Sequence, residues 1–386
     1  MAIETARASD EKLAVSGGEP WRDYVRTGPN TLGGRFLRTF WHPVCRSSDI
    51  EPGRTKPIRI LGEDFTLYRG QTGIAHVVGF RCAHRGTQLS AGWVQGDEIR
   101  CYYHGWKYDG SGQCTEQPAE VNPFCERMRI RSCPTQEYIG LIFVYFGEGD
   151  PPPLPHYPEV EQGAGLLENW YEEWPVNYFN RLENALDTVH VGFVHHQLGP
   201  FRGAKLLEAH ETAFGLSGTN NERTPGTPPN FGFHMPNMNY FFAPPKEPEL
   251  ETGPRPCFMW RVPVDDENHL VFGSQRVQVF DDRVEPYLER RGAAERLAEQ
   301  ESMIDVARKV LAGKVTTDYI IETRWWDINS VQDMVTLVGQ GIVADRDHEH
   351  LGQIDVGMVL LRNLYMREMR ALAEDRPLKQ WTRSET

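Results

Sequence analysis

Two cysteine–histidine pairs constrain this chain more than any other feature of its sequence. One residue separates Cys82 from His84, sixteen residues follow, and two residues separate Cys101 from His104. Four such side chains at short spacing predict a four-ligand metal site, and a structural zinc site of the Cys₂His₂ type is one interpretation. Zinc sites usually pair cysteines with cysteines and histidines with histidines, whereas each segment here supplies one of each. That mixture suits a [2Fe–2S] centre with two thiolates on one iron and two imidazoles on the other.

The composition is that of a soluble globular protein. Hydrophobic residues make up 39% of the 386 positions and charged residues 25%, and the length predicts two or three domains. Seven cysteines, an odd number, argue against a disulfide framework, so we expect the five outside the pairs to be free thiols. The net charge of −13 argues against non-specific binding to nucleic acid. No apolar run is long enough to span a membrane, and without a signal-peptide core we expect a cytoplasmic protein.

A proline tract divides the chain. The sequence GEGDPPPLPH (147–156) continues neither a central strand nor a helix, so we expect a domain boundary there. Residues 33–150 contain short β-type runs separated by glycine and turn residues, which predicts a small antiparallel β domain. Residues 151–386 predict a mixed α+β domain. Its expected elements are helices over 181–196, 287–312 and 355–374 and two strands around the DDEN turn within 257–280.

The charge is distributed unevenly over these segments. Residues 1–32 form a polar lead-in, which we expect to pack on the second domain, and carry a net charge of −1. Residues 33–150 carry +1 and residues 151–386 carry −13. The acidity therefore belongs to the second domain.

A second group of histidines lies in the segment RLENALDTVHVGFVHHQ (181–197). His190 and His195 are five residues apart, so an ideal helix turns them about 140° away from each other and does not point both at one metal. A π-bulge, or a helix that ends near Gly192, would bring them together. Taken alone, such a pair is more often two unrelated histidines. His196 is expected to point elsewhere.

The first motif resembles the Rieske domain, whose signature is C-x-H-x(15–17)-C-x-x-H. The match includes all four ligand positions and continues into Gly105-Trp106. The resemblance implies a [2Fe–2S] cluster, with Trp106 as the aromatic residue that covers it. The implied cluster ligands are Cys82, His84, Cys101 and His104.

The second motif, in the same chain and in the expected order, resembles that of the Rieske non-heme iron oxygenases. The family pattern E/N-x-x-D-x-x-H-x(4)-H is matched by Asn184, Asp187, His190 and His195. The resemblance covers about residues 33–375. It implies an oxygenase (alpha) component with a catalytic domain built on a central antiparallel sheet and helices that carry a mononuclear Fe(II). His190 and His195 are the implied iron ligands.

The third iron ligand is expected to be a later carboxylate, because two histidines and one carboxylate leave positions open for O₂ and substrate. Gln332-Asp333-Met334 resembles the family's ligand site, so we predict Asp333. Asp327 is interpreted as a helix N-cap. The tract ADRDHEHLGQID (344–355) resembles one found in the phthalate-dioxygenase-like branch and is expected to serve loop structure or subunit contacts. The remaining candidates are Asp345, Asp347, Glu349 and Asp355, the last also a plausible N-cap.

The resemblance also implies an assembly. The cluster of one subunit passes electrons to the iron of its neighbour in a head-to-tail homotrimer. Asp187 is the implied bridge, accepting hydrogen bonds from His190 and from His104 of the adjacent subunit. Asn184 is implied to approach the iron without being a firm ligand.

The implied reaction uses O₂ and two external electrons. No flavin or NAD motif is evident, so NAD(P)H-derived electrons must come through a separate flavin reductase, a ferredoxin, or both. The near-neutral cluster domain is the predicted docking surface for an acidic carrier. Aromatic residues within 231–245 suit an aromatic substrate. Ring dihydroxylation, monooxygenation with N- or O-dealkylation, and a pure electron-transfer or structural metal protein are the three interpretations; the second metal motif weighs against the last.

Overall fold

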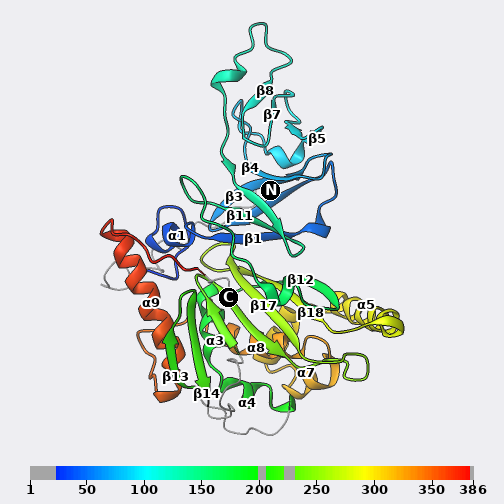
Figure 1. Cartoon of the computed structure of the whole chain (residues 1–386), viewed down its shortest axis with the longest axis vertical. Coiled ribbons are helices and arrows are strands. Elements are labelled where there is room, and N and C mark those ends of the chain that lie inside the picture. Colours follow the sequence, from blue (N-terminus) through cyan, green and yellow to red (C-terminus); the bar gives the residue numbers. More distant parts are fainter. Residues whose placement is uncertain (1–22, 199–205, 221–230, 383–386) are drawn as a thin grey trace.

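The structure is a computed structural model that describes residues 23–198, 206–220 and 231–382. The N-terminal strands lie in the upper part of Figure 1, and a large sheet with its helices lies below. The two parts touch directly. The main-chain N–H groups of Leu61 and Gly62 donate to the carbonyl oxygens of Pro263 and Val264, both at 2.8 Å. One hydrophobic core runs through the junction, where the rings of Phe143 and Trp260 meet edge to face at 5.6 Å.

The N-terminal part consists of three small antiparallel sheets, ordered β1-β11-β10, β2-β3-β4-β9 and β5-β6-β7-β8, preceded by helix α1 (Leu32–Leu37). Their strands are β1 (Trp41–Arg46), β2 (Thr55–Ile60), β3 (Glu63–Arg69), β4 (Ala75–Gly79), β5 (Trp93–Gln95), β6 (Glu98–Arg100), β7 (Lys107–Tyr108), β8 (Cys114–Glu116), β9 (Ser132–Cys133), β10 (Thr135–Tyr138) and β11 (Leu141–Tyr145). β11 is buried along its whole length because it lies between β1 and β10, which explains its unbroken apolar sequence LIFVY.

A two-residue turn, Ile139–Gly140, joins β10 to β11. Both residues have positive φ angles, 44° and 74°, as this kind of hairpin turn requires. A Cβ atom at Gly140 would lie 2.3 Å from Nδ2 of Asn169, which donates to the carbonyl of Ile139. Glycine therefore allows the close approach of the second part of the chain to this turn.

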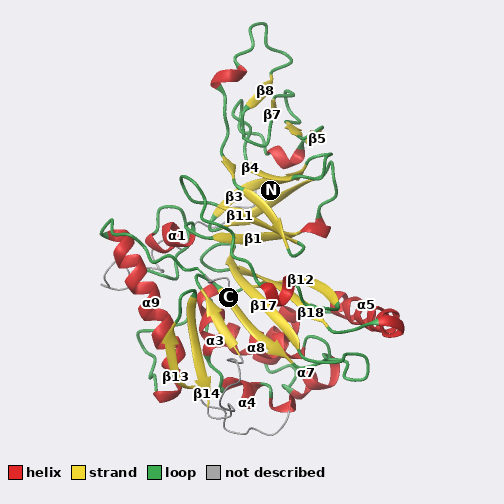
Figure 2. Ribbon diagram, viewed as in Figure 1, coloured by secondary structure: helices red, strands yellow, loops and turns green. Residues whose placement is uncertain are grey.

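The second part is built on one antiparallel sheet in the order β12-β18-β17-β16-β15-β14-β13 (Figure 2). Its strands are β12 (Leu166–Trp174), β13 (Leu206–Glu211), β14 (Gly215–Asn220), β15 (Phe231–His234), β16 (Met238–Ala243), β17 (Arg255–Pro263) and β18 (His269–Val277). β17 and β18 form the predicted hairpin around the DDEN turn. The prediction of a small antiparallel β domain followed by an α+β domain with a large antiparallel sheet is confirmed.

The helices of this part are α2 (Pro158–Glu161), α3 (Tyr178–Leu186), α4 (His190–Val194), α5 (Val284–Gln300), α6 (Met303–Leu311), α7 (Asp318–Thr323), α8 (Ile328–Gly339) and α9 (Val356–Ala373). α8 packs on the sheet through Met334 and Leu337, which join a core with Cys257 and Met259 of β17. α9 lies against β13 and α1. α3 lies against β17 of the sheet and against α9, and α4 follows it at the lower edge of the molecule in Figure 1.

Two expected helix caps occupy the right positions but make other bonds. Asp327 is the N-cap residue of α8, yet its carboxylate accepts from the guanidinium of Arg324 instead of a helical N–H group. Asp355 precedes α9, but its Oδ2 accepts from the N–H of Gly352 at 2.6 Å. In both cases the carboxylate accepts a hydrogen bond from a group in the preceding turn and not from an N–H group of the helix.

The proline tract lies between the two parts. Residues 147–156 contain neither helix nor strand and connect β11 to α2. Tyr24 and Val25 of the lead-in contact the start of α3, accepting hydrogen bonds from Tyr178 and Asn177 at 2.6 and 2.8 Å. Residues 1–22 lie outside the described chain. The domain limits 1–32, 33–150 and 151–386 stay predictions.

Candidate metal centres

Two loops with the same hydrogen-bond pattern present the first cysteine–histidine set. In one, the N–H of Gly86 donates to the carbonyl of Cys82, and in the other the N–H of Gly105 donates to that of Cys101, at 2.9 and 3.1 Å. Both glycines have φ near 73°, which lets each loop turn back. The β-type run over 98–108 therefore does not form one strand. β6 ends at Arg100 and β7 begins at Lys107, with the second loop between them.

The four side chains converge at the far end of the N-terminal part. Cys82 and Cys101 are buried, at 3% and 2% exposure, and their thiols are neighbours. The rings of His84 and His104 are half-buried, with centroids 4.5 Å apart. The indole of Trp106 stacks on His84 at 4.7 Å and is itself buried, so it belongs to the small core and covers a histidine at the same time.

The donor set fits a [2Fe–2S] cluster. Nδ1 of His84 is buried and has no hydrogen-bond partner among the described residues, which is expected of a nitrogen that ligates a metal. Burial raises the pKa of the Cys101 thiol, while the main-chain N–H groups of Tyr103 and His104 act in the opposite direction. Such N–H groups stabilise thiolate and sulfide charge. A cluster held here supplies one electron at a time.

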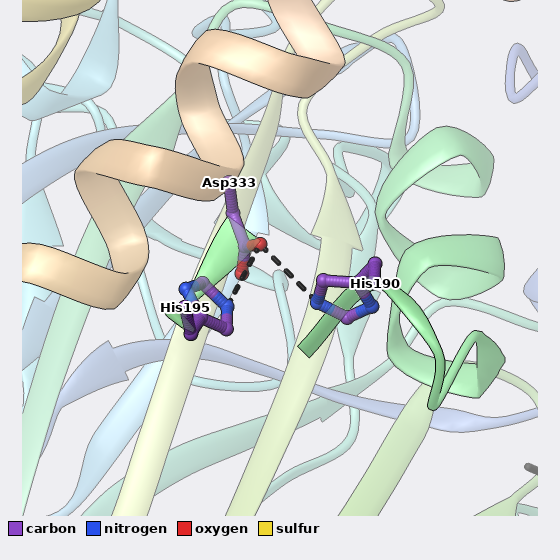
Figure 3. A group of neighbouring side chains, drawn as sticks. All are labelled: His190, His195 and Asp333. Carbon is purple, nitrogen blue, oxygen red and sulfur yellow. Dashed lines mark ion pairs between the residues drawn. The ribbon is translucent and has the colours of Figure 1, made fainter. Parts of the chain in front are cut away.

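The second set lies on α4, just after α4, and on α8 (Figure 3). Nε2 of His190 and Nε2 of His195 lie 3.4 and 3.2 Å from Oδ1 of Asp333. One ligand atom from each residue falls within 4.8 Å of the others, and this is the one such group of metal-binding side chains found in the described part of the chain. His195 and Asp333 are buried and His190 is half-buried.

No π-bulge brings the histidines together, but a helix does end close to Gly192. The chain leaves helical geometry at Asp187, the C-cap of α3, and α4 then begins at His190 and ends at Val194. His190 is thus the first residue of the short helix and His195 follows its last. Of the two predicted distortions the π-bulge is wrong; a break before His190 and the end of α4 at Val194, two residues after Gly192, produce the convergence.

Hydrogen bonds at Nδ1 orient both rings. Nδ1 of His190 contacts the main-chain carbonyl of Asp187, and Nδ1 of His195 lies 2.8 Å from Oε1 of Gln332. With Nδ1 engaged, each ring turns Nε2 toward Asp333, as metal-binding histidines do. Two imidazole nitrogens and one carboxylate oxygen fit an Fe(II) ion with open positions. Iron held there supplies the site for O₂ reduction.

Sequence reasoning missed Arg181. Its Nη1 lies 3.0 Å from Oδ2 of Asp333 and also donates to Oδ1 of Asn184. Nδ2 of Asn184 lies 3.4 Å from Oδ1 of Asp333, so Asn184 is beside the triad, as expected. An arginine on a helix usually indicates a face that is exposed to solvent. The one signal in the sequence was that Arg181 lies three residues before Asn184, a spacing that places both side chains on the same face of a helix.

Electrostatics hold Asp333 in its ionised, metal-binding form. Burial alone would raise the pKa of the Asp333 carboxyl, but Arg181 and the two histidines outweigh it and hold that pKa well below its usual range. Burial would lower the pKa of His190, yet Asp333 and the Asp187 carbonyl raise it. Asp333 is therefore a carboxylate at any ordinary pH.

Asp187 differs in detail from the expected bridge. Its Oδ1 accepts from the main-chain N–H groups of Val189 and His190, at 3.0 and 3.2 Å, and so caps α4. The link to the His190 ring uses the main-chain carbonyl, because the chain bends at Asp187 and the two residues do not share one helix. The carboxylate Oδ2 has no hydrogen-bond partner within the described residues.

The other late carboxylates lie outside the triad. Asp327 and Asp355 cap or pair locally as described above, Asp345 pairs with exposed His348, and Glu349 pairs with Arg362. Among the aromatic residues expected in the pocket, Phe241 faces the core of α8, whereas Tyr240 packs on Phe258. The side chain of Phe231 lies outside the described residues.

Comparisons with known proteins agree with this arrangement. The family described as "Rieske [2Fe-2S] domain" matches residues 40–138. The chain is 30% identical over 369 residues to the 5,5'-dehydrodivanillate O-demethylase oxygenase subunit of Sphingobium sp., covering 90% of this chain and 79% of that protein. It is 30% identical over 384 residues to the tert-butanol monooxygenase / tert-amyl alcohol desaturase oxygenase subunit of Aquincola tertiaricarbonis, covering 89% and 75%.

Solved structures show the same fold. NdmA of Pseudomonas putida CBB5 superposes with a TM-score of 0.63 at 18% identity, over 88% of this chain and 92% of that one. The oxygenase in a ferredoxin complex of carbazole 1,9a-dioxygenase gives 0.60 at 20% identity, over 90% and 92%. In the described part of the chain, no helix combines the length and the apolar character that a membrane crossing requires.

The chain therefore belongs to the Rieske non-heme iron oxygenases. Within that family it is a terminal oxygenase component, an oxidoreductase whose cofactors are a Rieske [2Fe–2S] cluster and a mononuclear iron.

Proposed function

We propose that this chain oxygenates an aromatic compound at an Fe(II) ion held by His190, His195 and Asp333. The observation that carries the proposal is the convergence of two oriented Nε2 atoms on one carboxylate oxygen, from separate elements. Electrons reach that site from a cluster held by Cys82, Cys101, His84 and His104.

The ligand assignments are tested by metal content. Asp333→Ala should lose the mononuclear iron and keep the cluster's absorption and labile sulfide, and Cys101→Ser should do the reverse. An Asp333→Ala protein with unchanged iron per chain would refute the assignment of the triad. Zinc in place of iron and sulfide would refute the cluster ligands.

We further propose a head-to-tail homotrimer in which electrons pass between subunits. The cluster loops beside β7 and the helix α4 lie at opposite ends of the chain in Figure 1, so one subunit does not bring its two centres together. Exposed aromatic residues flank the cluster histidine: Tyr102 is 71% and Tyr103 is 56% exposed. On α4, Phe193 is 65% exposed beside the triad. Docking one surface on the other covers both and places His104 near Asp187 of the next subunit.

Such docking is compatible with the geometry of Asp187. Its Oδ1 is used by the cap of α4, and its Oδ2 remains to accept a hydrogen bond from His104 of the neighbouring subunit. The main-chain carbonyl of the same residue contacts His190. Asp187 thereby connects a neighbouring cluster to an iron ligand through one residue.

Aromatic ring hydroxylation is the proposed reaction, and O-demethylation of an aromatic compound is the second candidate. O-demethylation is supported by the share of this chain that aligns with each relative. The O-demethylase subunit aligns with 90% of this chain, whereas the 3-chlorobenzoate-3,4-dioxygenase oxygenase subunit of Comamonas testosteroni aligns with 45%. A screen of methoxylated and unsubstituted aromatic compounds with a surrogate reductase, followed by product mass, separates the two. A cis-dihydrodiol gains two oxygens and two hydrogens, whereas demethylation leaves the product lighter by one CH₂.

We propose a ferredoxin, reduced by a flavin reductase, as electron donor. One solved structure of this fold is an oxygenase with its ferredoxin. The near-neutral segment 33–150 carries the cluster, while the segment after residue 150 has a net charge of −13, so an acidic carrier is repelled least at the cluster end. Because salt screens the repulsion from the acidic segment, reduction of the cluster by an acidic ferredoxin should become faster as salt rises; a rate that falls steeply with salt would contradict this account of the docking surface.

A further inference from the structure

We propose that Arg181 is a positioning residue that occupies the second oxygen of Asp333, so that Asp333 offers a bound metal one carboxylate oxygen only. This rests on the proposed function of the triad. The Arg181 and Asp333 side chains are 7% and 6% exposed, and Nη1 lies 3.0 Å from Oδ2. The Nε2 atoms of the two histidines face the other oxygen, Oδ1. The two oxygens therefore have different partners.

Two contacts besides Asp333 fix the guanidinium of Arg181. The same Nη1 donates to Oδ1 of Asn184, one helical turn further along α3. The guanidinium carbon lies 4.7 Å from the ring centroid of Trp174, a cation–π contact in a buried place. The indole Nε1 of Trp174 donates in turn to Oε2 of Glu172 at 3.0 Å. Arg181 is thus held from α3 and from the end of β12, independently of Asp333.

The ion pair with Arg181 determines whether Asp333 can bind a metal through one carboxylate oxygen or through both. A carboxylate that chelates a metal through both oxygens would have to leave Arg181, and separating a buried ion pair strands an uncompensated charge. A carboxylate bound through Oδ1 keeps that pair intact. With two imidazoles, it then fills three positions of a six-coordinate ion and leaves the others for O₂ and substrate. Chelation would close one of those positions.

The test uses the full chain with its cluster in place and Co(II) at the mononuclear site. Co K-edge X-ray absorption reports only the added metal, so the iron of the cluster does not contribute. In wild type we expect one carboxylate oxygen on cobalt. In Arg181→Met we expect one further oxygen and the short Co–C distance of a chelating carboxylate. Arg181→Gln, whose amide ends two bonds short of Nη1, should give the same result if the Met variant does not fold.

Arg255→Met is the matched control. Arg255 is a buried arginine of β17 whose carboxylate partner is Glu251, at 3.2 Å. Its loss should lower the melting temperature without altering the cobalt edge. Identical edges in wild type, Arg181→Met and Arg181→Gln would overturn the proposal, as would an equal change in Arg255→Met.

Failure of the triad itself gives a different result. If wild type binds no Co(II), or if His195→Ala binds it unchanged, the ligand assignment is wrong. If wild type binds through the triad and the Arg181 variants do not change the coordination, only the positioning role of Arg181 is wrong.

Discussion

Oε1 of Gln332 lies 2.8 Å from Nδ1 of His195, so the residue before Asp333 on α8 orients one of the histidines that Asp333 faces. The amide of Gln332 also donates to Oε1 of Gln197, at 3.0 Å, just beyond His195 in the chain. α8 therefore supplies both one proposed ligand and the group that turns another proposed ligand toward it. Movement of α8 would disturb two ligands at once.

Replacing Gln332 should weaken iron binding. Gln332→Leu keeps much of the volume but removes the acceptor for Nδ1, and loss of such a partner typically costs about 10- to 100-fold in metal affinity. Fe(II) titration and iron-to-sulfide ratios measure this. Gln197→Leu, one hydrogen bond further out, is the control and should stay close to wild type. Equal affinity in wild type and Gln332→Leu would show that His195 is oriented by packing alone.

Replacing Asp187 should separate capping from electron transfer. Asparagine caps a helix about as well as aspartate, so Asp187→Asn should keep the cap of α4 and both metals, while losing the charge that we propose accepts the bond from His104 of the neighbouring subunit. We expect coupled turnover to stop. Asp187→Ala should in addition lower the free energy of unfolding by about 1 kcal/mol, because the cap is lost. Normal turnover in Asp187→Asn would exclude the bridge.

The buried ring of His42 should make stability sensitive to acid. Nε2 donates to the carbonyl of Leu37 at 2.8 Å, and Nδ1 lies 3.3 Å from the amide of Asn237, so the ring is neutral. Complete burial lowers its pKa to about 4 from the ordinary 6.5, against the opposing effect of the Leu37 carbonyl. Because the folded pKa lies below the unfolded one, this contribution is full above about pH 6.5 and is lost as pH falls toward 4.

The loss corresponds to a destabilisation on the order of 3 kcal/mol. Urea unfolding at pH 7.5 and 4.5 measures it, and His42→Gln should show a smaller difference between the two pH values than wild type. His156→Gln is the control, since that side chain is 61% exposed. A pH difference in His42→Gln as large as that of wild type would assign the acid sensitivity to other groups.

The sequence predicted more of the fold than of the way in which the side chains of the site come together. Alternating and apolar runs sufficed for β17, β18 and the small sheets, because these patterns depend on local burial. The approach of His190 to His195 could not be derived from helical periodicity, because the chain breaks at Asp187 and periodicity assumes a continuous helix. Arg181 was missed for a related reason: its role depends on burial against α8, which lies far along the chain.

Mixing two inactive chains tests transfer between subunits. Cys101→Ser should lack the cluster and keep the iron, and Asp333→Ala should do the opposite, so neither variant alone should turn over. In a head-to-tail ring, an Asp333→Ala subunit reduces a neighbouring Cys101→Ser subunit. Random assembly from equal amounts makes on the order of a quarter of the contacts productive, as each of the three directed contacts needs one chain of each kind in order.

Co-expression of differently tagged chains, with purification through both tags, isolates the mixed rings. Each variant carrying both tags on separate copies is the control and should remain inactive. Mixed trimers with both cofactors loaded but no activity would place the electron path within one subunit, against the arrangement proposed for Asp187 and His104.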